Sequence, residues 1–147
     1  MADALAPPGT KPGATDDLLK AAEAARVHAY APYSNFAVGA AIRGASGAIY
    51  GGTNVENAAY PVGTCAEAGA IAAMIAGGDR QIVEVMVTGA GTTPITPCGA
   101  CRQRIREFAG PGTPIHAGGP DGILASFTLA GLLPEAFGPE NLGIRPV

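Results

Sequence analysis

The sequence predicts a three-layer α/β domain, in which helices cover both faces of one mixed sheet of about five strands. Helical and strand patterns follow one another in the order α-β-β-α-β-α-β-β-α, which is typical of this architecture. A chain of 147 residues is most simply one domain that buries about 70% of its unfolded surface. Hydrophobic residues make up 48% and charged residues 14%, which indicates a compact core and a lightly charged surface.

The N-terminal part of the chain predicts a tail and then a helix. Residues 1–14 are rich in Pro, Gly and Ala and are expected to be disordered, which leaves 15–147 as the folded domain. A helix is predicted over 17–30, where Thr15 or Asp16 can serve as the N-cap. Its apolar stripe consists of Leu18, Leu19, Ala22, Ala25 and Val27.

The middle of the chain predicts a β-hairpin followed by a second helix. The strands 36–44 and 48–57 flank a short turn that contains Ser and Gly. After a loop, an Ala-rich helix is predicted over 65–76, and Gly77 and Gly78 end it.

The remaining elements complete the sheet and its second helical face. The alternating, β-branched pattern of 81–89 predicts a buried strand. A helix is predicted over 98–110, with Gly110 as its stop. Two short strands at 113–119 and 123–128 precede a short helix and a tail at 129–147.

Composition and charge exclude several kinds of partner. The net charge is −3, and the nine Lys and Arg residues form no basic run, which argues against a nucleic acid polymer. The N-terminus lacks the basic and apolar regions of a secretory signal, and no apolar run reaches the roughly 18 residues of a membrane span. We therefore expect a cytoplasmic protein without a membrane partner.

The three cysteines, Cys65, Cys98 and Cys101, have the spacing of a metal site. An odd number of cysteines argues against a disulfide framework. Cys98 and Cys101 form a C-x-x-C at the start of a helix, so that their side chains lie about 60° apart on one face. Cys65 begins the other core helix. Three thiolates that leave one open position are typical of catalytic rather than structural zinc.

Glu67 strengthens this interpretation because it lies in the first turn of the helix that Cys65 begins. A carboxylate beside the open position can move protons without binding the metal. The spacing C-A-E followed by P-C-x-x-C is that of zinc deaminases. The alternatives are a redox C-x-x-C and a structural zinc site that lacks its fourth ligand; the redox alternative would leave Cys65 and Glu67 unexplained. His28 and His116 are expected to be a surface or core histidine rather than a fourth ligand.

Four ordered blocks of the chain resemble the cytidine deaminase family, specifically its small homotetrameric members with three cysteine ligands. The resemblance implies one Zn²⁺ per subunit, held by Cys65, Cys98 and Cys101, with zinc-activated water and Glu67 as proton shuttle. It also implies deamination of cytidine and 2′-deoxycytidine to uridine and 2′-deoxyuridine plus ammonia, a step of pyrimidine salvage. The blocks are AYAPYSNFAVGAA (29–41), NVENAAYPVGTCAE (54–67), PCGACRQRIREF (97–108) and LLPEAFGPENL (132–142).

The same resemblance assigns the sugar contacts to Asn54 and Glu56. These residues are two apart at the end of a strand and so point to one face of the sheet. Taken alone, this pattern would favour a turn with a solvated carboxylate. In the family, however, this pair holds the ribose 3′-hydroxyl, which implies that both ribose and deoxyribose are accepted.

The contacts with the base are likewise implied by the resemblance. Phe36 would otherwise be a core residue, and Tyr60 and Phe137 would be loop anchors. In the family, Phe36 packs on the pyrimidine, the backbone around Ala66 binds the ring, and Phe137 stacks on the base from a neighbouring subunit. Tyr60 lies near a subunit boundary. The expected assembly is therefore a homotetramer with shared active sites.

One position departs from the family pattern and raises a question of charge. Many relatives have Arg directly after C-A-E, whereas this chain has Ala68. Three thiolates outweigh the charge of one Zn²⁺, so another cation is expected to compensate. Arg102, four residues after Cys98, is the predicted source, while Arg104 lies about 90° from the thiols. Either arginine could instead be solvated or lie at an interface.

Three other functions compete with this interpretation. A deaminase for another aminated pyrimidine, such as a nucleoside antibiotic, is disfavoured by Asn54 and Glu56, which a related group lacks here. A zinc-binding scaffold would have no need for Glu67 over the metal. A polynucleotide deaminase would need a basic, aromatic surface, which nine Lys and Arg residues hardly supply.

Overall fold

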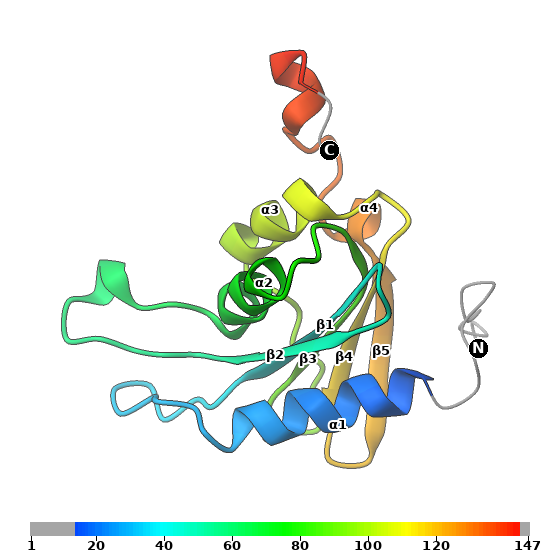
Figure 1. The fold of residues 1–147 in the computed structure, drawn as a ribbon. Coiled ribbons are helices and arrows are strands. Elements are labelled where there is room, and N and C mark those ends of the chain that lie inside the picture. Colours follow the sequence, from blue (N-terminus) through cyan, green and yellow to red (C-terminus); the bar gives the residue numbers. More distant parts are fainter. Residues whose placement is uncertain (1–13, 145–147) are drawn as a thin grey trace.

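Five strands form one mixed sheet in the order β2-β1-β3-β4-β5 (Figure 1). The computed structural model describes residues 14–144. The central pair, β3 and β4, is parallel, and every other neighbouring pair is antiparallel. The strands are β1 (Gly39–Gly44), β2 (Ile49–Thr53), β3 (Ile82–Thr88), β4 (Pro114–Gly119) and β5 (Gly122–Thr128).

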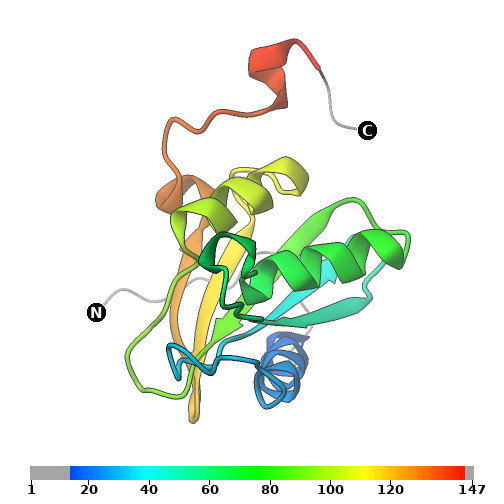
Figure 2. The same cartoon turned by 90° about the vertical axis from the view of Figure 1, so that its left-hand side faces the viewer.

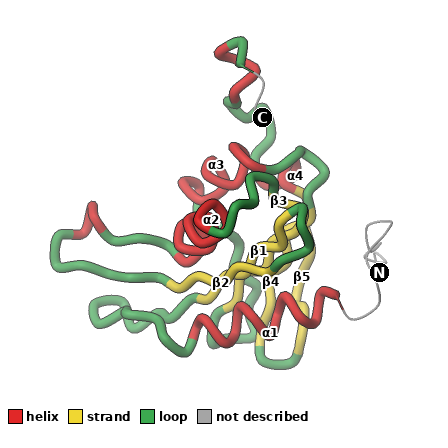
Figure 3. Tube along the Cα trace, in the orientation of Figure 1, coloured by secondary structure: helices red, strands yellow, loops and turns green. Residues whose placement is uncertain are grey.

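Helices cover both faces of the sheet, as the sequence predicts. Helix α1 (Ala14–Arg26) packs on one face, while α2 (Ala66–Ala76) and α3 (Gly99–Phe108) lie on the other (Figure 2). Short helical turns follow: η1 (Tyr60–Val62) in an extended loop, α4 (Leu129–Leu132) after β5, and η2 (Pro139–Leu142) on a C-terminal arm (Figure 3). The three-layer α/β fold and its five-stranded sheet are thus confirmed.

The central strand β3 shows why two separate cores form. It is buried on both faces, so its sequence is almost continuously apolar rather than strictly alternating. Val85 and Val87 join the larger core under α2 and α3, whereas Met86 joins Leu18 and Ala22 in the core under α1. Alternate side chains of one strand therefore hold the two helical layers in place.

Two glycines allow the helices to lie unusually close to the sheet. A Cβ atom at Gly52 of β2 would lie 2.3 Å from the carbonyl oxygen of Ala66 and 2.3 Å from the amide nitrogen of Ala70. A Cβ atom at Gly39 of β1 would lie 2.0 Å from the carbonyl oxygen of Ala22. These contacts involve backbone atoms, so no side-chain movement can relieve them. Gly52 consequently sets the depth at which the start of α2 sits on the sheet.

The first helix begins and ends earlier in the chain than predicted. It ends at Arg26 rather than Tyr30, and Val27 of the expected apolar stripe is 70% exposed. The chain leaves the helix because the backbone of Tyr30 hydrogen-bonds Asn54 and Glu56 across an isolated β-bridge. Thr15 does not act as a simple cap, since α1 already begins at Ala14 and the Thr15 hydroxyl donates to Glu84 at 3.2 Å.

The predicted tail lies almost entirely outside the described residues, apart from Ala14, which is helical. Within residues 14–144, no helix is both long enough and apolar enough to span a bilayer.

Candidate active site

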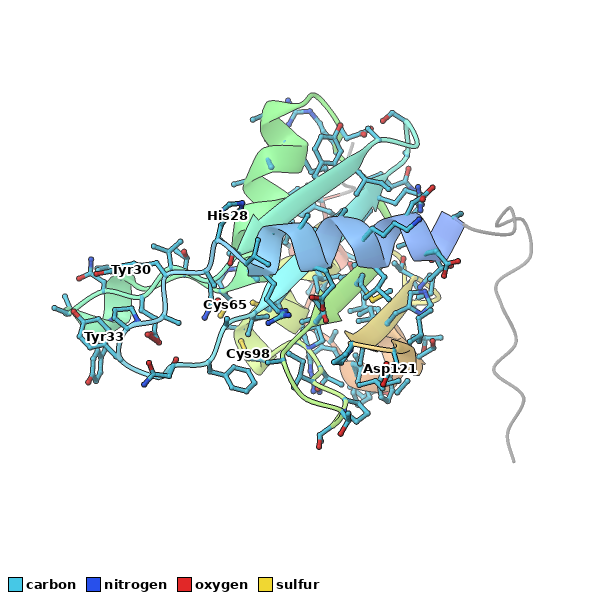
Figure 4. All side chains as sticks on the ribbon, turned by 90° about the horizontal axis from the view of Figure 1, so that it is seen from below. His28, Tyr30, Tyr33, Cys65, Cys98 and Asp121 are labelled. Atoms are coloured by element: carbon cyan, nitrogen blue, oxygen red, sulfur yellow. The ribbon has the colours of Figure 1, made fainter. Side chains whose placement is uncertain are left out.

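The three cysteines meet where the starts of α2 and α3 face each other. Cys65 and Cys98 are the N-cap residues of these helices, and Cys101 lies in the first turn of α3. The Sγ atoms of Cys65 and Cys98 are 3.8 Å apart, and all three Sγ atoms lie within 4.8 Å of one another. Figure 4 shows Cys65 and Cys98 side by side, whereas Asp121 lies apart from them on the turn between β4 and β5.

This cluster fits a zinc ion. Two sulfur atoms bound to tetrahedral zinc at about 2.3 Å are separated by about 3.8 Å, which matches the Cys65–Cys98 distance. Cys101 is fully buried whereas Cys98 is exposed, so one side of the cluster stays accessible. Both helix starts also favour negative charge. Burial raises the pKa of the metal-free Cys101 thiol, so a bound cation is needed to hold it as a thiolate.

Neither histidine joins the cluster. His116 on β4 is buried, and its ring nitrogens hydrogen-bond Ser126 at 2.7 Å and Glu84 at 3.0 Å. His28 is exposed just after α1. Both observations confirm the prediction that these residues are a core and a surface histidine, because the cluster found among residues 14–144 contains only the three cysteines.

Glu67 is a buried carboxylic acid beside the sulfur atoms. It lies in the first turn of α2 and is only 4% exposed. Burial raises the pKa of Glu67 above its ordinary value, although its backbone hydrogen bonding and the positive charge of Arg104 act in the opposite direction. A raised pKa makes a carboxyl group better suited than an ordinary one both to accept and to return a proton.

A cavity of about 520 Å³ opens beside Glu67 and the cluster. Its size suits a small ligand. None of its lining residues is Lys, Arg or His, so its fixed charges are the carboxylates of Glu56 and Glu67. The lining consists of Phe36, Val38, Asn54, Val55, Glu56, Tyr60, Gly63, Thr64, Cys65, Ala66, Glu67, Val87, Ile95, Thr96 and Cys98.

Known proteins similar to this chain are cytidine deaminases. The family model described as the cytidine and deoxycytidylate deaminase zinc-binding region matches residues 14–116. The chain belongs to the cytidine and deoxycytidylate deaminase family. The cytidine deaminase of Sporosarcina psychrophila is 40% identical over 127 residues, which cover 86% of this chain and 93% of that protein. The cytidine deaminase of Halalkalibacterium halodurans is 39% identical over 125 residues, 85% of this chain and 95% of that protein.

Solved cytidine deaminases share the fold. The Burkholderia pseudomallei structure has a TM-score of 0.78 and 42% identity, and the match covers 83% of this chain and 98% of that one. The Mycobacterium leprae structure has a TM-score of 0.73 and 43% identity, with 82% and 98% covered. Family membership and the three-cysteine cluster together fit one Zn²⁺ per chain.

Most residues that the sequence assigned to the deaminase site do line this cavity. Phe36, Asn54, Glu56, Tyr60 and Ala66 all contribute to its wall. Sequence reasoning missed the apolar wall formed by Val38, Val87 and Ile95, as well as Thr96. Val38 and Val87 lie at the ends of strands whose spacing identifies them only as core residues, so no local signal marked them as part of a site.

Asn54 has a structural task that its spacing did not reveal. Its Oδ1 accepts a hydrogen bond from the Val38 amide at 2.9 Å, and its Nδ2 donates to the Phe36 carbonyl at 2.8 Å. One side chain therefore fixes residues 36–38, which explains why β1 begins at Gly39 and not at Phe36. Asn54 consequently positions the aromatic wall of the deaminase cavity.

Glu56 is anchored through one of its two oxygens. Oε1 accepts hydrogen bonds from the backbone amides of Tyr33 at 2.9 Å and Ser34 at 3.1 Å. Hydrogen bonds from Ser34 and Tyr33 lower the pKa of Glu56, so this carboxyl is ionised at neutral pH. The residue thus joins the loop 31–37 to the cavity wall and contributes a fixed negative charge.

Phe137 does not reach the cavity of its own chain. It lies on the C-terminal arm, 58% exposed, where its carbonyl oxygen accepts a hydrogen bond from Gln103 at 3.0 Å. Tyr60, 78% exposed, packs edge-on against Tyr33 with ring centroids 6.1 Å apart. Both aromatic residues therefore present apolar surface to the outside of the isolated chain.

The structure reverses the roles predicted for two arginines. Arg102 donates to the Pro97 carbonyl at 2.7 Å, the Leu132 carbonyl at 2.8 Å and the Thr96 hydroxyl at 2.9 Å, so it does not face the thiols. Arg104 instead places Nη1 3.8 Å from the Sγ of Cys101. Helical spacing from Cys98 misled the prediction because Cys98 is an extended cap residue, whereas Arg104 lies three residues after the helical Cys101.

Proposed function

We propose that this chain catalyses the hydrolytic deamination of cytidine and 2′-deoxycytidine, with water as co-substrate and ammonia as second product. The observation that carries the proposal is the buried carboxyl of Glu67 beside three converging sulfur atoms at an accessible cavity. Relatives named cytidine deaminase, about 40% identical over most of the chain, support it.

In this proposal, Cys65, Cys98 and Cys101 hold one zinc ion. When bound, zinc supplies Lewis-acid activation of a water molecule. The helix starts that carry Cys65 and Cys98 stabilise the negative charge of the thiolates, and burial of Cys101 closes one side of the cluster. Cys98 remains on the cavity side, where substrate enters.

Glu67 moves the protons. Its carboxylate takes a proton from the attacking water and delivers it to N3 of the pyrimidine as oxygen adds at C4. It then takes the proton of the new C4 hydroxyl and passes it to the 4-amino group, so that the C–N bond breaks, ammonia leaves and the C4 carbonyl forms. Its raised pKa suits both directions of transfer.

The remaining lining residues orient the nucleoside. Glu56 and Asn54 face the sugar, with Glu56 accepting a hydrogen bond from the 3′-hydroxyl, so that a 2′-hydroxyl is not required. Phe36 packs against the base, and the Ala66 backbone hydrogen-bonds its edge. All four residues line one cavity, which supports this arrangement.

The cavity favours a nucleoside over its phosphate. The matched family includes enzymes of cytidine and of deoxycytidylate. A phosphate would need cationic or multiple amide donors, whereas the lining has two carboxylates and no Lys, Arg or His. We therefore propose that phosphorylated substrates are rejected by electrostatic repulsion.

We further propose that the active form is a homotetramer, in which Phe137 completes the site of a neighbouring subunit and Tyr60 lies at a boundary. The exposure of both aromatic residues supports an assembly that covers them. The cytoplasmic location expected from the sequence stays a prediction.

The test measures turnover and zinc on the same samples. Wild-type protein should deaminate cytidine and 2′-deoxycytidine, which is measured as a loss of ultraviolet absorbance. It should not deaminate 2′-deoxycytidine 5′-phosphate. Glu67→Gln should keep one zinc per chain but lose at least about 100-fold in kcat. Glu107→Gln, which removes an exposed carboxylate of α3, should match wild type. Full activity of the Glu67→Gln variant would overturn the proposal. So would a wild-type protein that deaminates only 2′-deoxycytidine 5′-phosphate and neither nucleoside.

A further inference from the structure

The sulfur cluster carries more negative charge than one Zn²⁺ can balance. Three thiolates exceed the charge of the ion by one, and the ionised form of Glu67 adds another negative charge beside them. None of the cavity-lining residues is a cation. The helix starts that carry Cys65 and Cys98 contribute only partial positive charge. Among residues 14–144, a full compensating charge would therefore have to come from a side chain outside the cavity lining.

Arg104 is the side chain that brings a positive charge to the sulfur cluster. Its guanidinium donates from Nη1 to the Sγ of Cys101 at 3.8 Å, a distance within the range of a hydrogen bond to sulfur. Cys101 is fully buried, so this contact approaches the cluster on the side away from substrate. Within residues 14–144, Arg104 is the basic side chain that hydrogen-bonds a cysteine sulfur.

Three other arginines of the described residues are engaged with oxygen atoms. Arg102 is directed to two carbonyls and a hydroxyl, Arg106 forms an ion pair with Glu140, and Arg43 forms one with Glu84. Arg104 also has the required reach, since it lies three residues after Cys101 on α3 and therefore on the same face of that helix.

We propose that Arg104 is a positioning residue of the metal centre, whose fixed positive charge stabilises the Cys101 thiolate and thereby tightens zinc binding. The inference rests on the zinc site proposed above. Ala68, the residue directly after Glu67, offers no charge of its own. Arg104 on α3 thus supplies the positive charge that α2 lacks at the position after Glu67. Outer contacts of this kind typically change metal affinity by about 10–100-fold.

The experiment measures zinc affinity by competition with a chromogenic chelator, independently of turnover. Arg104→Gln should bind zinc about 10–100-fold more weakly than wild type, and Arg104→Lys should recover part of the loss because it keeps the charge. Arg80→Gln removes an exposed arginine between α2 and β3 and is the matched control for net charge. Its zinc affinity should equal that of wild type.

The salt dependence of zinc affinity distinguishes an electrostatic role of Arg104 from a role in packing. Because Arg104 is largely exposed, the affinity gap between wild type and Arg104→Gln should narrow by severalfold when the ionic strength rises from about 0.05 to 1 M. Equal affinity of Arg104→Gln and wild type overturns the inference. A gap that is unchanged by salt, with Arg104→Lys as weak as Arg104→Gln, also overturns it. A wild-type protein that binds no zinc would instead refute the metal site itself.

Discussion

Cys65 and Cys98 hold the same position in two different helices, and their sulfur atoms lie 3.8 Å apart. Each is the N-cap residue, with an extended backbone that lets its side chain lie over the open end of the helix. Both helices lie on one face of the sheet, so the helix starts are brought together by the layer packing. A binding site for a cation arises here without any ligand from a strand.

Loss of one cysteine should uncouple zinc from stability. We expect Cys98→Ala to lose tight zinc binding and turnover, because two thiolates cannot complete the site. Addition of a chelator should lower the Tm of wild type but leave the Tm of Cys98→Ala unchanged, as measured by circular dichroism. Thr93→Ala, in the exposed loop before Cys98, serves as the control. One tightly bound zinc in Cys98→Ala would contradict the assignment.

Glu56→Gln should weaken substrate binding rather than chemistry. The carboxylate is ionised and lines the cavity, so replacing it with an amide weakens a charge-assisted hydrogen bond to the sugar. We expect KM for cytidine to rise by about 10–100-fold with a smaller change in kcat, measured by steady-state kinetics. Asp121→Asn, far from the cavity, is the control (Figure 4).

The use of 3′-deoxycytidine sharpens this prediction. This substrate lacks the hydroxyl that Glu56 is proposed to bind, so Glu56→Gln should affect it much less than it affects cytidine. An equal effect on both nucleosides would show that Glu56 acts only by holding the loop at Tyr33 and Ser34.

Two adjacent glycines of β2 should respond very differently to alanine. Gly52→Ala places Cβ 2.3 Å from backbone atoms of α2 and should destabilise the protein by about 3 kcal/mol. Gly51→Ala meets the Ala25 side chain at an ordinary 3.5 Å and should change stability by less than about 1 kcal/mol. Urea unfolding of both variants measures the difference. Similar stability of the two variants would disprove the close approach of α2.

A buried polar network under α1 should make stability depend on acidity. Glu84 is 2% exposed and hydrogen-bonds His116 at 3.0 Å and Arg43 at 3.1 Å. Burial alone would raise the pKa of Glu84, but these two partners outweigh it and lower the pKa below its ordinary value of 4.5. Because the pKa of Glu84 is lower in the folded than in the unfolded state, its ionised carboxylate stabilises the protein at pH values above the unfolded-state pKa. This stabilisation is lost as the pH falls through the folded-state pKa.

Glu84→Gln should therefore be less stable than wild type at pH 7, by about 1.5–3 kcal/mol, and this gap should shrink as the pH falls below 4.5. Denaturant unfolding from pH 7 to pH 3 measures it, with Glu107→Gln as the control on the surface of α3. A gap that stays constant over this range would show that Glu84 does not contribute through its charge.

The order of the elements, the three-layer fold and the reactive residues at the helix starts could all be predicted from the sequence. These features depend on hydrophobic periodicity, glycine stops and spacing within a helix, all of which are local properties. That is why the cluster of Cys65, Cys98 and Cys101 and the cavity position of Glu67 agree with prediction.

The partners of individual polar side chains depend on the packing of segments that are distant in the sequence. Asn54 fixes residues 36–38, α1 stops at Arg26 because Tyr30 bridges to a distant segment, and Arg104 rather than Arg102 contacts sulfur. A long polar side chain has several partners within reach, and the packing of segments far apart in the chain selects among them. Local periodicity places such a residue on a helix or strand, but it carries no information about which distant atoms it will meet.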